Sequence, residues 1–462
     1  MHHIVLTRRG FIAAGIAAVG AGRLPWRLDA RGAPLLRRPV PSPAQLVWQR
    51  DELALFIHFG VNTFTDREWG DGREDPGLFA PSRMDARQWA RAARAAGFRA
   101  MILTAKHHDG FCLWQTRTTQ HSVARSPWRG GNGDVVWEFT QACHAEGLRA
   151  GLYCSPWDQN APSYGDSPRY DDFYCDQLTE LLTRYGPIHE VWFDGANGEG
   201  PDGRRQVYDW QRYWSLVRRL QPDAVIFSDA GPDVRWIGNE RGVAGETNWS
   251  TVDLDAVPFP GATGDHVIRA LQEGDPAGTV WRPGETDVSI RPGWFYHPAE
   301  DDRVKTVDDL VEIFFTSVGR NSKLLLNVPP TRDGVLHPTD VERLAGLHAR
   351  LGSTFATDLA ANRLTDWRVT GERTAIAELD LIRTVSVGIA DLREDIEHGQ
   401  AVARYVLEGF DGSVWRPLAG GTTIGYRKLD RFAPASVRRV RVVVEDAVDT
   451  PGPVRIGLYA NP

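Results

Sequence analysis

The feature that most constrains the fold is an alternation that runs from Leu53 to about Thr357, in which short apolar runs precede amphipathic helical segments. This alternation is typical of βα units and a parallel sheet. The apolar runs predict strands at residues 53–59, 100–105, 150–154, 190–193, 224–228 and 323–328, with weaker ones near Ala244 and Ser289. The amphipathic segments predict helices at residues 86–96, 135–146, 173–185, 208–220 and 310–318.

Six clear strands and two weak ones predict an α/β fold, a (β/α)8-like TIM barrel over residues 31–357. A doubly wound open sheet is the alternative. Against it, no strand is followed by a G-x-G-x-x-G turn, and polar and aromatic residues gather just after the strand ends, where barrel enzymes keep their sites. We therefore expect a catalytic barrel.

The last part of the chain has a different pattern. Residues 358–462 contain short β-rich runs separated by Asp-Gly, Gly-Gly and Pro-Gly turns, after a last helical segment at residues 341–355. This pattern predicts a separate all-β domain, a β-sandwich.

Composition narrows the possible partners. Hydrophobic residues make up 42% of the 462 residues and charged residues 24%, which excludes a disordered or coiled-coil chain. The net charge of −7 gives no basic footprint for nucleic acid. The 17 tryptophans are numerous enough to suggest aromatic stacking on the apolar faces of sugars as well as core packing.

The N-terminus resembles a twin-arginine export signal. Arg8 and Arg9 precede an apolar, small-residue run at residues 13–22, which is too short to span a bilayer as a helix. We expect residues 1–30 to direct export to a periplasmic or secreted location, and we expect no membrane span elsewhere. The four cysteines form no C-x-x-C pair, so we expect buried free thiols.

An acidic residue follows the fourth predicted strand. Asp194 stands in Trp-Phe-Asp-Gly, where a carboxylate at the mouth of a barrel is desolvated yet reachable. An N-cap on the next helix is the structural alternative. The Trp and His residues on neighbouring strand ends favour a catalytic role for Asp194.

Three histidines, His58, His107 and His108, also follow strands and allow a metal site as an alternative. Adjacent strand residues point to opposite faces, and no H-x-H or H-E-x-x-H motif accompanies them. Neutral imidazoles are equally suited to hydrogen bonding of sugar hydroxyls, and a buried structural role is the alternative for one of the three histidines. We expect no metal and no cofactor.

Four motifs in order resemble the α-L-fucosidases of glycoside hydrolase family 29. They are Phe-Ile-His-Phe-Gly at 56–60, Lys-His-His-Asp-Gly-Phe at 106–111, Gly-Leu-Tyr at 151–153 and Trp-Phe-Asp-Gly at 192–195. Segments 236–240 and 287–295 resemble the branch of this family that prefers α-1,3/1,4-linked fucose in branched glycans. The resemblance covers most of residues 45–357.

The resemblance implies a retaining mechanism with Asp194 as nucleophile and a fucosylated oligosaccharide as substrate. It places the acid/base at Glu240, with Glu246 as runner-up and Glu285 as a further candidate. It also implies a set of substrate-binding residues: His58, Glu68, Trp69, His107, His108, Tyr153, Trp192, Glu285, Arg291 and Trp294. Trp249 or Trp281 would hold a neighbouring galactose.

Three other functions remain open at this point. A retaining glycosidase of another sugar would share the barrel and the carboxylates. A catalytically inactive carbohydrate-binding relative would keep the His and Trp cluster but lack one carboxylate. A metal-dependent hydrolase would use His58, His107, His108 and Asp194 as ligands.

Overall fold

The computed structural model describes residues 38–461, so the predicted export signal at residues 1–30 lies outside the described residues. The helices are α1 (Pro43–Asp51), α2 (Val61–Thr65), α3 (Ala86–Ala95), α4 (Val135–Glu146), α5 (Ser167–Arg184), α6 (Trp210–Leu220), α7 (Asp265–Glu273), α8 (Val307–Thr316) and α9 (Pro338–Thr354). Among the described residues, no helix combines the length and apolarity needed to cross a bilayer.

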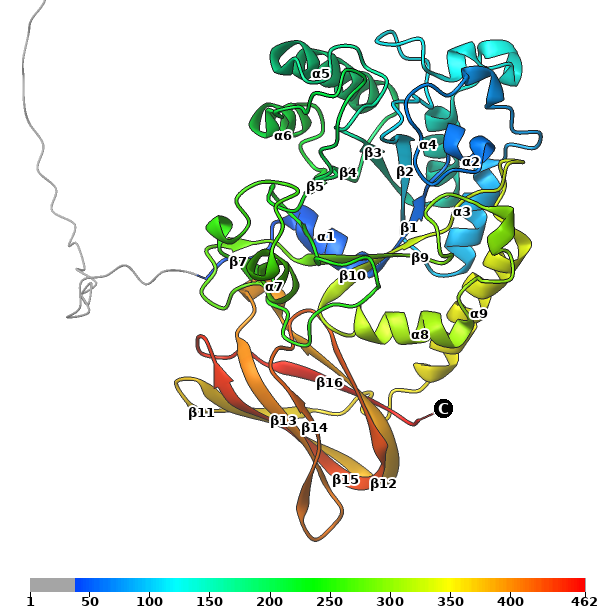
Figure 1. The fold of residues 1–462 in the computed structure, drawn as a ribbon. Helices are drawn as coiled ribbons and strands as arrows, with labels where there is room; N and C mark the ends of the chain where they lie inside the picture. Colours follow the sequence, from blue (N-terminus) through cyan, green and yellow to red (C-terminus); the bar gives the residue numbers. More distant parts are fainter. Residues whose placement is uncertain (1–37, 462) are drawn as a thin grey trace, which may run out of the picture. The chain divides into compact units, whose positions relative to one another are not determined.

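Eight parallel strands form the barrel sheet (Figure 1). They are β1 (Leu53–Ile57), β2 (Ala100–Lys106), β3 (Arg149–Cys154), β4 (Glu190–Trp192), β5 (Val225–Phe227), β6 (Arg235–Trp236), β9 (Gly284–Ser289) and β10 (Ser322–Asn327). Their order is β5-β4-β3-β2-β1-β10-β9-β6, and a parallel bridge between Phe227 and Val234 links the two ends. The predicted (β/α)8-like barrel is confirmed.

Helices α3, α4, α5 and α6 each connect successive strands from β1 to β5, and α8 connects β9 to β10. The region between β6 and β9 carries α7 and a small antiparallel sheet of β7 (Thr251–Val252) and β8 (Val280–Trp281). Strands β5 and β6 are joined by residues 228–234 without a helix. The second half of the barrel is therefore irregular.

The sequence explains where the barrel elements form. Strands β1, β2 and β10 are buried at every position, because helices and the barrel interior cover both faces of a parallel sheet. Side-chain caps set the helix starts: Asp85, Asp134 and Asp209 each accept a hydrogen bond from a backbone N–H in the first turn of α3, α4 and α6. Thr306 and Asp309 form a capping box on α8.

The weak strand expected near Ala244 is absent. The sixth barrel strand is Arg235–Trp236, and Ala244 lies in a loop where its N–H donates to the carbonyl of Thr316. A strand of two residues, one of them charged, produces no apolar run in the sequence. This explains why the sequence analysis placed the sixth strand near Ala244 instead of at Arg235–Trp236.

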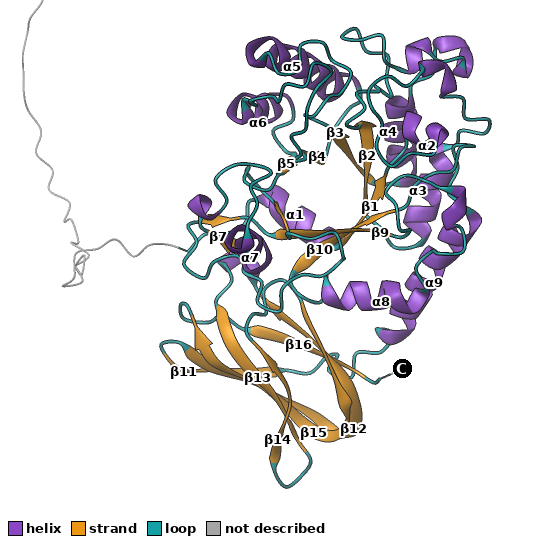
Figure 2. Cartoon of the chain, in the orientation of Figure 1, coloured by secondary structure: helices purple, strands orange, loops and turns teal. Residues whose placement is uncertain are grey.

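After α9 the chain contains strands without further α-helix, as Figure 2 shows. They are β11 (Thr365–Gly371), β12 (Thr374–Glu394), β13 (Val402–Phe410), β14 (Trp415–Gly421), β15 (Lys428–Ala447) and β16 (Val454–Tyr459). All pair antiparallel, and the long strands β12 and β15 continue through bulges around a shared apolar core. The predicted all-β domain is present.

The four cysteines, Cys112, Cys143, Cys154 and Cys175, are buried free thiols, as predicted.

Candidate active site

A cavity of about 290 Å³ opens at the carboxyl ends of the barrel strands. It is lined by Phe56, His58, Glu68, Trp69, His107, His108, Tyr153, Trp192, Asp194, Glu240, Asp287 and Trp294. Apart from Glu285, Arg291 and the alternative candidates Glu246, Trp249 and Trp281, every site residue predicted from the sequence is in this set. They come together because parallel strands bring their carboxyl ends to one face of a barrel.

Asp194 follows β4 and is held by three neighbours. The Tyr153 hydroxyl donates to its Oδ2 at 3.0 Å, and the Ala196 N–H donates to its Oδ1 at 2.7 Å. The Nε2 of His108 lies 3.8 Å from Oδ2. The side chain is 27% exposed and lines the cavity. Asp194 is thus an oriented carboxylate that a substrate can reach.

The three histidines are buried and neutral. Burial lowers the pKa of His58 to about 3, lowers that of His107 well below its ordinary value, and lowers that of His108. His58 Nδ1 hydrogen-bonds Asn327 Oδ1 at 2.9 Å, and His108 Nδ1 hydrogen-bonds Ser155 Oγ at 2.7 Å. One ring nitrogen of His58 and one of His108 are therefore already hydrogen-bonded, which leaves the other nitrogen of each ring for a ligand hydroxyl.

A metal site would need several such ligands converging on one point. Within residues 38–461, no group of three or more His, Cys, Asp or Glu side chains is arranged to hold a metal ion.

Glu240 lies on the loop after β6. The indole N–H of Trp294 donates to its Oε2 at 3.3 Å. Burial first, and then the negative charges of Asp194 and Glu68, raise the pKa of Glu240 above its ordinary value. A carboxyl group with a raised pKa keeps its proton at higher pH, which suits a general acid.

Glu68 fixes the loop that closes the other side of the cavity. It accepts hydrogen bonds from the backbone N–H groups of Trp294 and Phe295, and it contacts His297 Nε2 at 3.0 Å. The neighbouring Trp69 is 61% exposed at the rim of the cavity.

Two acidic residues of the site were missed by the sequence analysis. Asp287 on β9 is buried, accepts the Trp236 indole N–H at 2.8 Å, and has its pKa raised well above the ordinary value by burial and by the charge of Glu240. Asp229 follows β5, and burial raises its pKa to about 6. The register of β4 and β5 points to Asp229. Trp192 pairs with Phe227, and Asp194 and Asp229 each lie two residues after one member of that pair.

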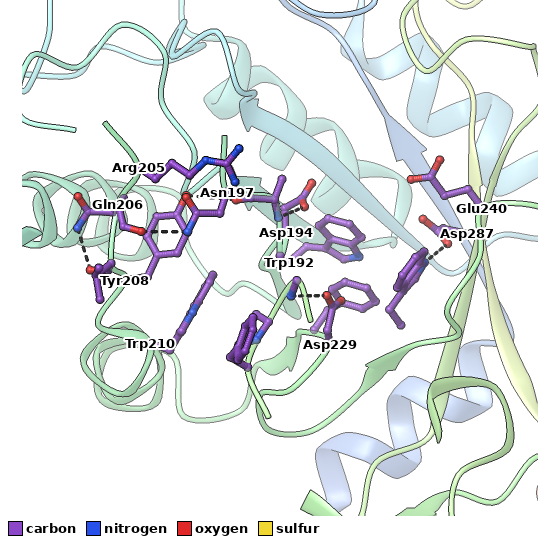
Figure 3. Close-up of a pocket in the computed structure, with 18 residues that line it drawn as sticks. Trp192, Asp194, Asn197, Arg205, Gln206, Tyr208, Trp210, Asp229, Glu240 and Asp287 are labelled. Carbon is purple, nitrogen blue, oxygen red and sulfur yellow. Dashed lines mark hydrogen bonds between the residues drawn. The ribbon is translucent and has the colours of Figure 1, made fainter. Parts of the chain in front are cut away.

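A second cavity, of about 660 Å³, shares part of its wall with the first, and Figure 3 shows the residues that line this second cavity. Both are lined by Trp192, Asp194, Glu240 and Asp287. The rest of its wall mixes polar and aromatic side chains, among them Asn197, Arg205, Gln206, Tyr208, Trp210, Asp229, Trp236 and Phe259. A ligand that occupies both cavities must pass Asp194 and Glu240.

Two predicted substrate-binding residues do not reach either cavity. Glu285 is fully buried inside the barrel, where it accepts the indole N–H of Trp192. Arg291 donates two hydrogen bonds to Asp340 and one to Asp301. Its guanidinium group is therefore paired with these carboxylates and does not face a substrate.

The alternative acid/base candidate Glu246 and the two tryptophans expected to hold galactose also lie outside both cavities. Glu246 is 81% exposed and lies 3.5 Å from Arg320, outside both cavities. Trp249 and Trp281 are core residues, and the Trp281 N–H donates to Gln49.

A parallel barrel whose strand ends surround a deep cavity with carboxylates, neutral imidazoles and indole rings has the architecture of a glycoside hydrolase. Comparison with known proteins defines the family: the sequence profile of the alpha-L-fucosidase family matches residues 74–352. Alpha-L-fucosidase 1 of Arabidopsis thaliana is 41% identical over 452 residues, which cover 92% of this chain and 88% of that protein.

Solved structures agree. A Ruminococcus gnavus GH29 fucosidase in complex with fucose has a TM-score of 0.83 at 30% identity, covering 92% of this chain and 95% of that chain. A glycoside hydrolase 29 family member from an unknown rumen bacterium has a TM-score of 0.85 at 40% identity, covering 92% and 78%. The chain belongs to the α-L-fucosidases of glycoside hydrolase family 29.

Proposed function

We propose that this α-L-fucosidase is exo-acting and retaining, with Asp194 as nucleophile and Glu240 as acid/base. The supporting observation is that both carboxyl groups line both cavities, so a glycosidic bond that spans the cavities lies between them. The inner cavity, about 290 Å³, has room for one terminal sugar, and the outer one receives the leaving group. Fucose bound in the Ruminococcus gnavus relative supports fucose as that sugar.

In the first step, an oxygen of Asp194 attacks the anomeric carbon while the bond to the leaving oxygen breaks and Glu240 donates its proton to that oxygen. In the second step, the Glu240 carboxylate takes a proton from water, whose oxygen attacks the same carbon and releases Asp194. Two inversions give net retention. Tyr153 and the Ala196 N–H keep the Asp194 carboxylate oriented in both steps.

For the linkage, we propose α-1,3/1,4-linked fucose on branched glycans of the Lewis type. The outer cavity, about 660 Å³, supports this choice because it is large enough for more than one sugar and offers both aromatic and polar walls. Contacts with a remote sugar orient the scissile bond, so a branched substrate gains more than a linear one.

Two experiments test the proposal. Asp194→Gly should lower turnover by several orders of magnitude, and azide should restore turnover with an azide product of inverted configuration. Near-normal activity of Asp194→Gly would exclude Asp194 as nucleophile. Separately, a Lewis-type trisaccharide should be cleaved with a higher kcat/KM than 2′-fucosyllactose, and the reverse order would exclude only the linkage preference.

We also propose that residues 1–30 direct export by the twin-arginine route. The support is the Arg8-Arg9 pair before the apolar run. Arg8→Lys combined with Arg9→Lys should retain the protein in the cytoplasm of a bacterial host that exports the unchanged chain. An unchanged chain found only in the cytoplasm would contradict the proposal.

A further inference from the structure

Beneath the catalytic cavity, the barrel interior holds a buried cluster of two carboxyl groups and one ammonium group. Glu190 begins β4, Glu285 lies on β9 and Lys323 on β10, and all three side chains have 1% exposure or less. Lys323 Nζ donates to Glu190 Oε2 at 3.0 Å and lies 3.7 Å from Glu285 Oε2. If both acids were ionised, the cluster would carry one uncompensated negative charge in a medium that disfavours it strongly.

Within residues 38–461, Lys323 is the only cationic side chain that forms an ion pair with Glu190 or Glu285. Lys323 Nζ lies 4.5 Å from the ring centre of Trp48, whose indole N–H donates to Glu190 Oε2 at 2.8 Å. The next acid, Asp51, already pairs with Arg149 at 2.6 Å and lies 3.2 Å from His189. Compensation within the cluster therefore requires one proton.

The hydrogen-bond pattern indicates which carboxyl group holds that proton. Glu190 Oε2 accepts two donors, Lys323 Nζ and the Trp48 N–H, as an ionised group would. Among the described residues, Glu190 Oε1 and Glu285 Oε2 have no hydrogen-bond partner, and the two side chains lie within hydrogen-bonding reach of each other, so a proton shared between them would satisfy both. Burial first, and then the charge of Glu190, raise the pKa of Glu285 well above its ordinary value.

Glu285 reaches the active site through Trp192. Its Oε1 accepts the indole N–H of Trp192 at 3.0 Å, while a face of that indole ring stacks on Phe227 with ring centres 4.1 Å apart. Trp192 lines both cavities and stands two residues before Asp194. The orientation of this wall thus depends on an acceptor at Glu285.

We propose that Glu285 is a neutral carboxylic acid that donates its proton to Glu190 and accepts the Trp192 N–H, so that it acts as a positioning residue for the wall shared by the two cavities. Glu285 has this role whichever carboxylate attacks the sugar and whichever linkage the enzyme prefers.

A pair of Glu285 variants tests the role. Glu285→Gln keeps both functions of a protonated carboxyl group, because its amide donates to Glu190 and its carbonyl accepts from Trp192; kcat/KM for an aryl fucoside should stay within about threefold of the unchanged enzyme. Glu285→Leu keeps the volume but removes the acceptor, and KM should rise about tenfold with a smaller change in kcat. An equal loss of kcat/KM in both variants would overturn the proposal, and so would an unchanged KM in folded Glu285→Leu.

Infrared spectroscopy detects directly whether the Glu285 carboxyl group is protonated. This test does not require Glu285→Leu to fold. At neutral pH, the difference spectrum between the unchanged enzyme and Glu285→Gln should contain the carbonyl stretch of a protonated carboxyl group, and its absence would overturn the assignment. Glu190→Gln is the matched control: because it removes the ionised partner of Lys323, it should lower the unfolding temperature more than Glu285→Gln does. The opposite order would place the proton on Glu190.

Discussion

The phenolic O–H of Tyr153, at the end of the third barrel strand, donates a 3.0 Å hydrogen bond to Oδ2 of Asp194, which follows the fourth. Strand register creates this contact, since Tyr153 pairs with Trp192 in the parallel ladder and Asp194 lies two residues beyond Trp192 on the same side. The donor fixes the orientation of the carboxylate before any substrate binds.

Removing this donor should slow the reaction. A hydrogen bond to a charged group contributes about 1.5–3 kcal/mol, so Tyr153→Phe should lower kcat/KM by about 10- to 100-fold. Steady-state kinetics on an aryl fucoside measure the loss. Tyr170→Phe is the matched control, because the Tyr170 hydroxyl donates to the carbonyl of Pro156 and lines neither cavity. We expect it to affect stability alone, and an equal kinetic loss in both variants would contradict a specific role for Tyr153.

Glu240→Ala should discriminate between leaving groups. An activated aryl fucoside needs little protonation of its leaving oxygen, whereas a sugar leaving group does, so the variant should lose far more kcat/KM on a natural glycan. Glu246→Ala is the control, because Glu246 is exposed beside Arg320. The leaving-group signature in Glu246→Ala, and not in Glu240→Ala, would reverse the assignment.

The pH profile should report the electrostatics around Glu240. The acid must be protonated, so kcat/KM on a poor leaving group should fall as pH rises through the pKa of Glu240. Glu68 raises this pKa and the Trp294 N–H lowers it. Glu68→Gln should therefore move the basic limb to lower pH and Trp294→Phe should move it to higher pH, each by up to about one unit. Shifts in the same direction would exclude Glu240 as the titrating group.

The sequence predicted the barrel strands well where they are long apolar runs, as in β1, β2 and β10. A strand covered on both faces carries apolar residues at successive positions and not in alternation with polar ones, so it stands out in the sequence. The sequence prediction misplaced β6, whose two residues, Arg235 and Trp236, carry no such pattern. Strand pairing supplies what the local sequence lacks: β6 is held by its parallel partner β9.

His58, His107, His108 and Asp194, which follow strand ends, were predicted from the sequence, whereas Asp229 after β5 was missed. On β9, the position of a side chain depends on its depth within the barrel, and there the prediction was wrong. Glu285 and Asp287 point to the same face of β9, but Glu285 stands two residues earlier, about 6–7 Å deeper along the strand. Asp287 therefore reaches the cavity and Glu285 enters the buried cluster below it. The two-residue spacing predicts that Glu285 and Asp287 share a face of β9, but it does not predict how far down the strand the cavity extends.

Arg291 should prove to be a stability residue. Its side chain and that of Asp340 are both fully buried, and removing one partner of such a pair costs about 3–5 kcal/mol. Arg291→Met should lower the free energy of unfolding by this amount in urea titrations. The matched control Arg350→Met breaks the exposed pair with Asp308 and should cost less than about 1 kcal/mol. Equal costs would mean that the buried pair contributes no more than a surface one.

The outer cavity should contribute only when the leaving group is large. Phe259 lines this cavity and is 57% exposed, so its ring is available for an apolar sugar face. Phe259→Ala should lower kcat/KM on a branched glycan by about tenfold while leaving a small aryl fucoside unaffected, because only the larger substrate makes the contact. Leu254→Ala removes another exposed apolar side chain, 49% exposed and outside this cavity, and should change neither rate. A loss on both substrates in Phe259→Ala would instead place the Phe259 ring against the fucose itself.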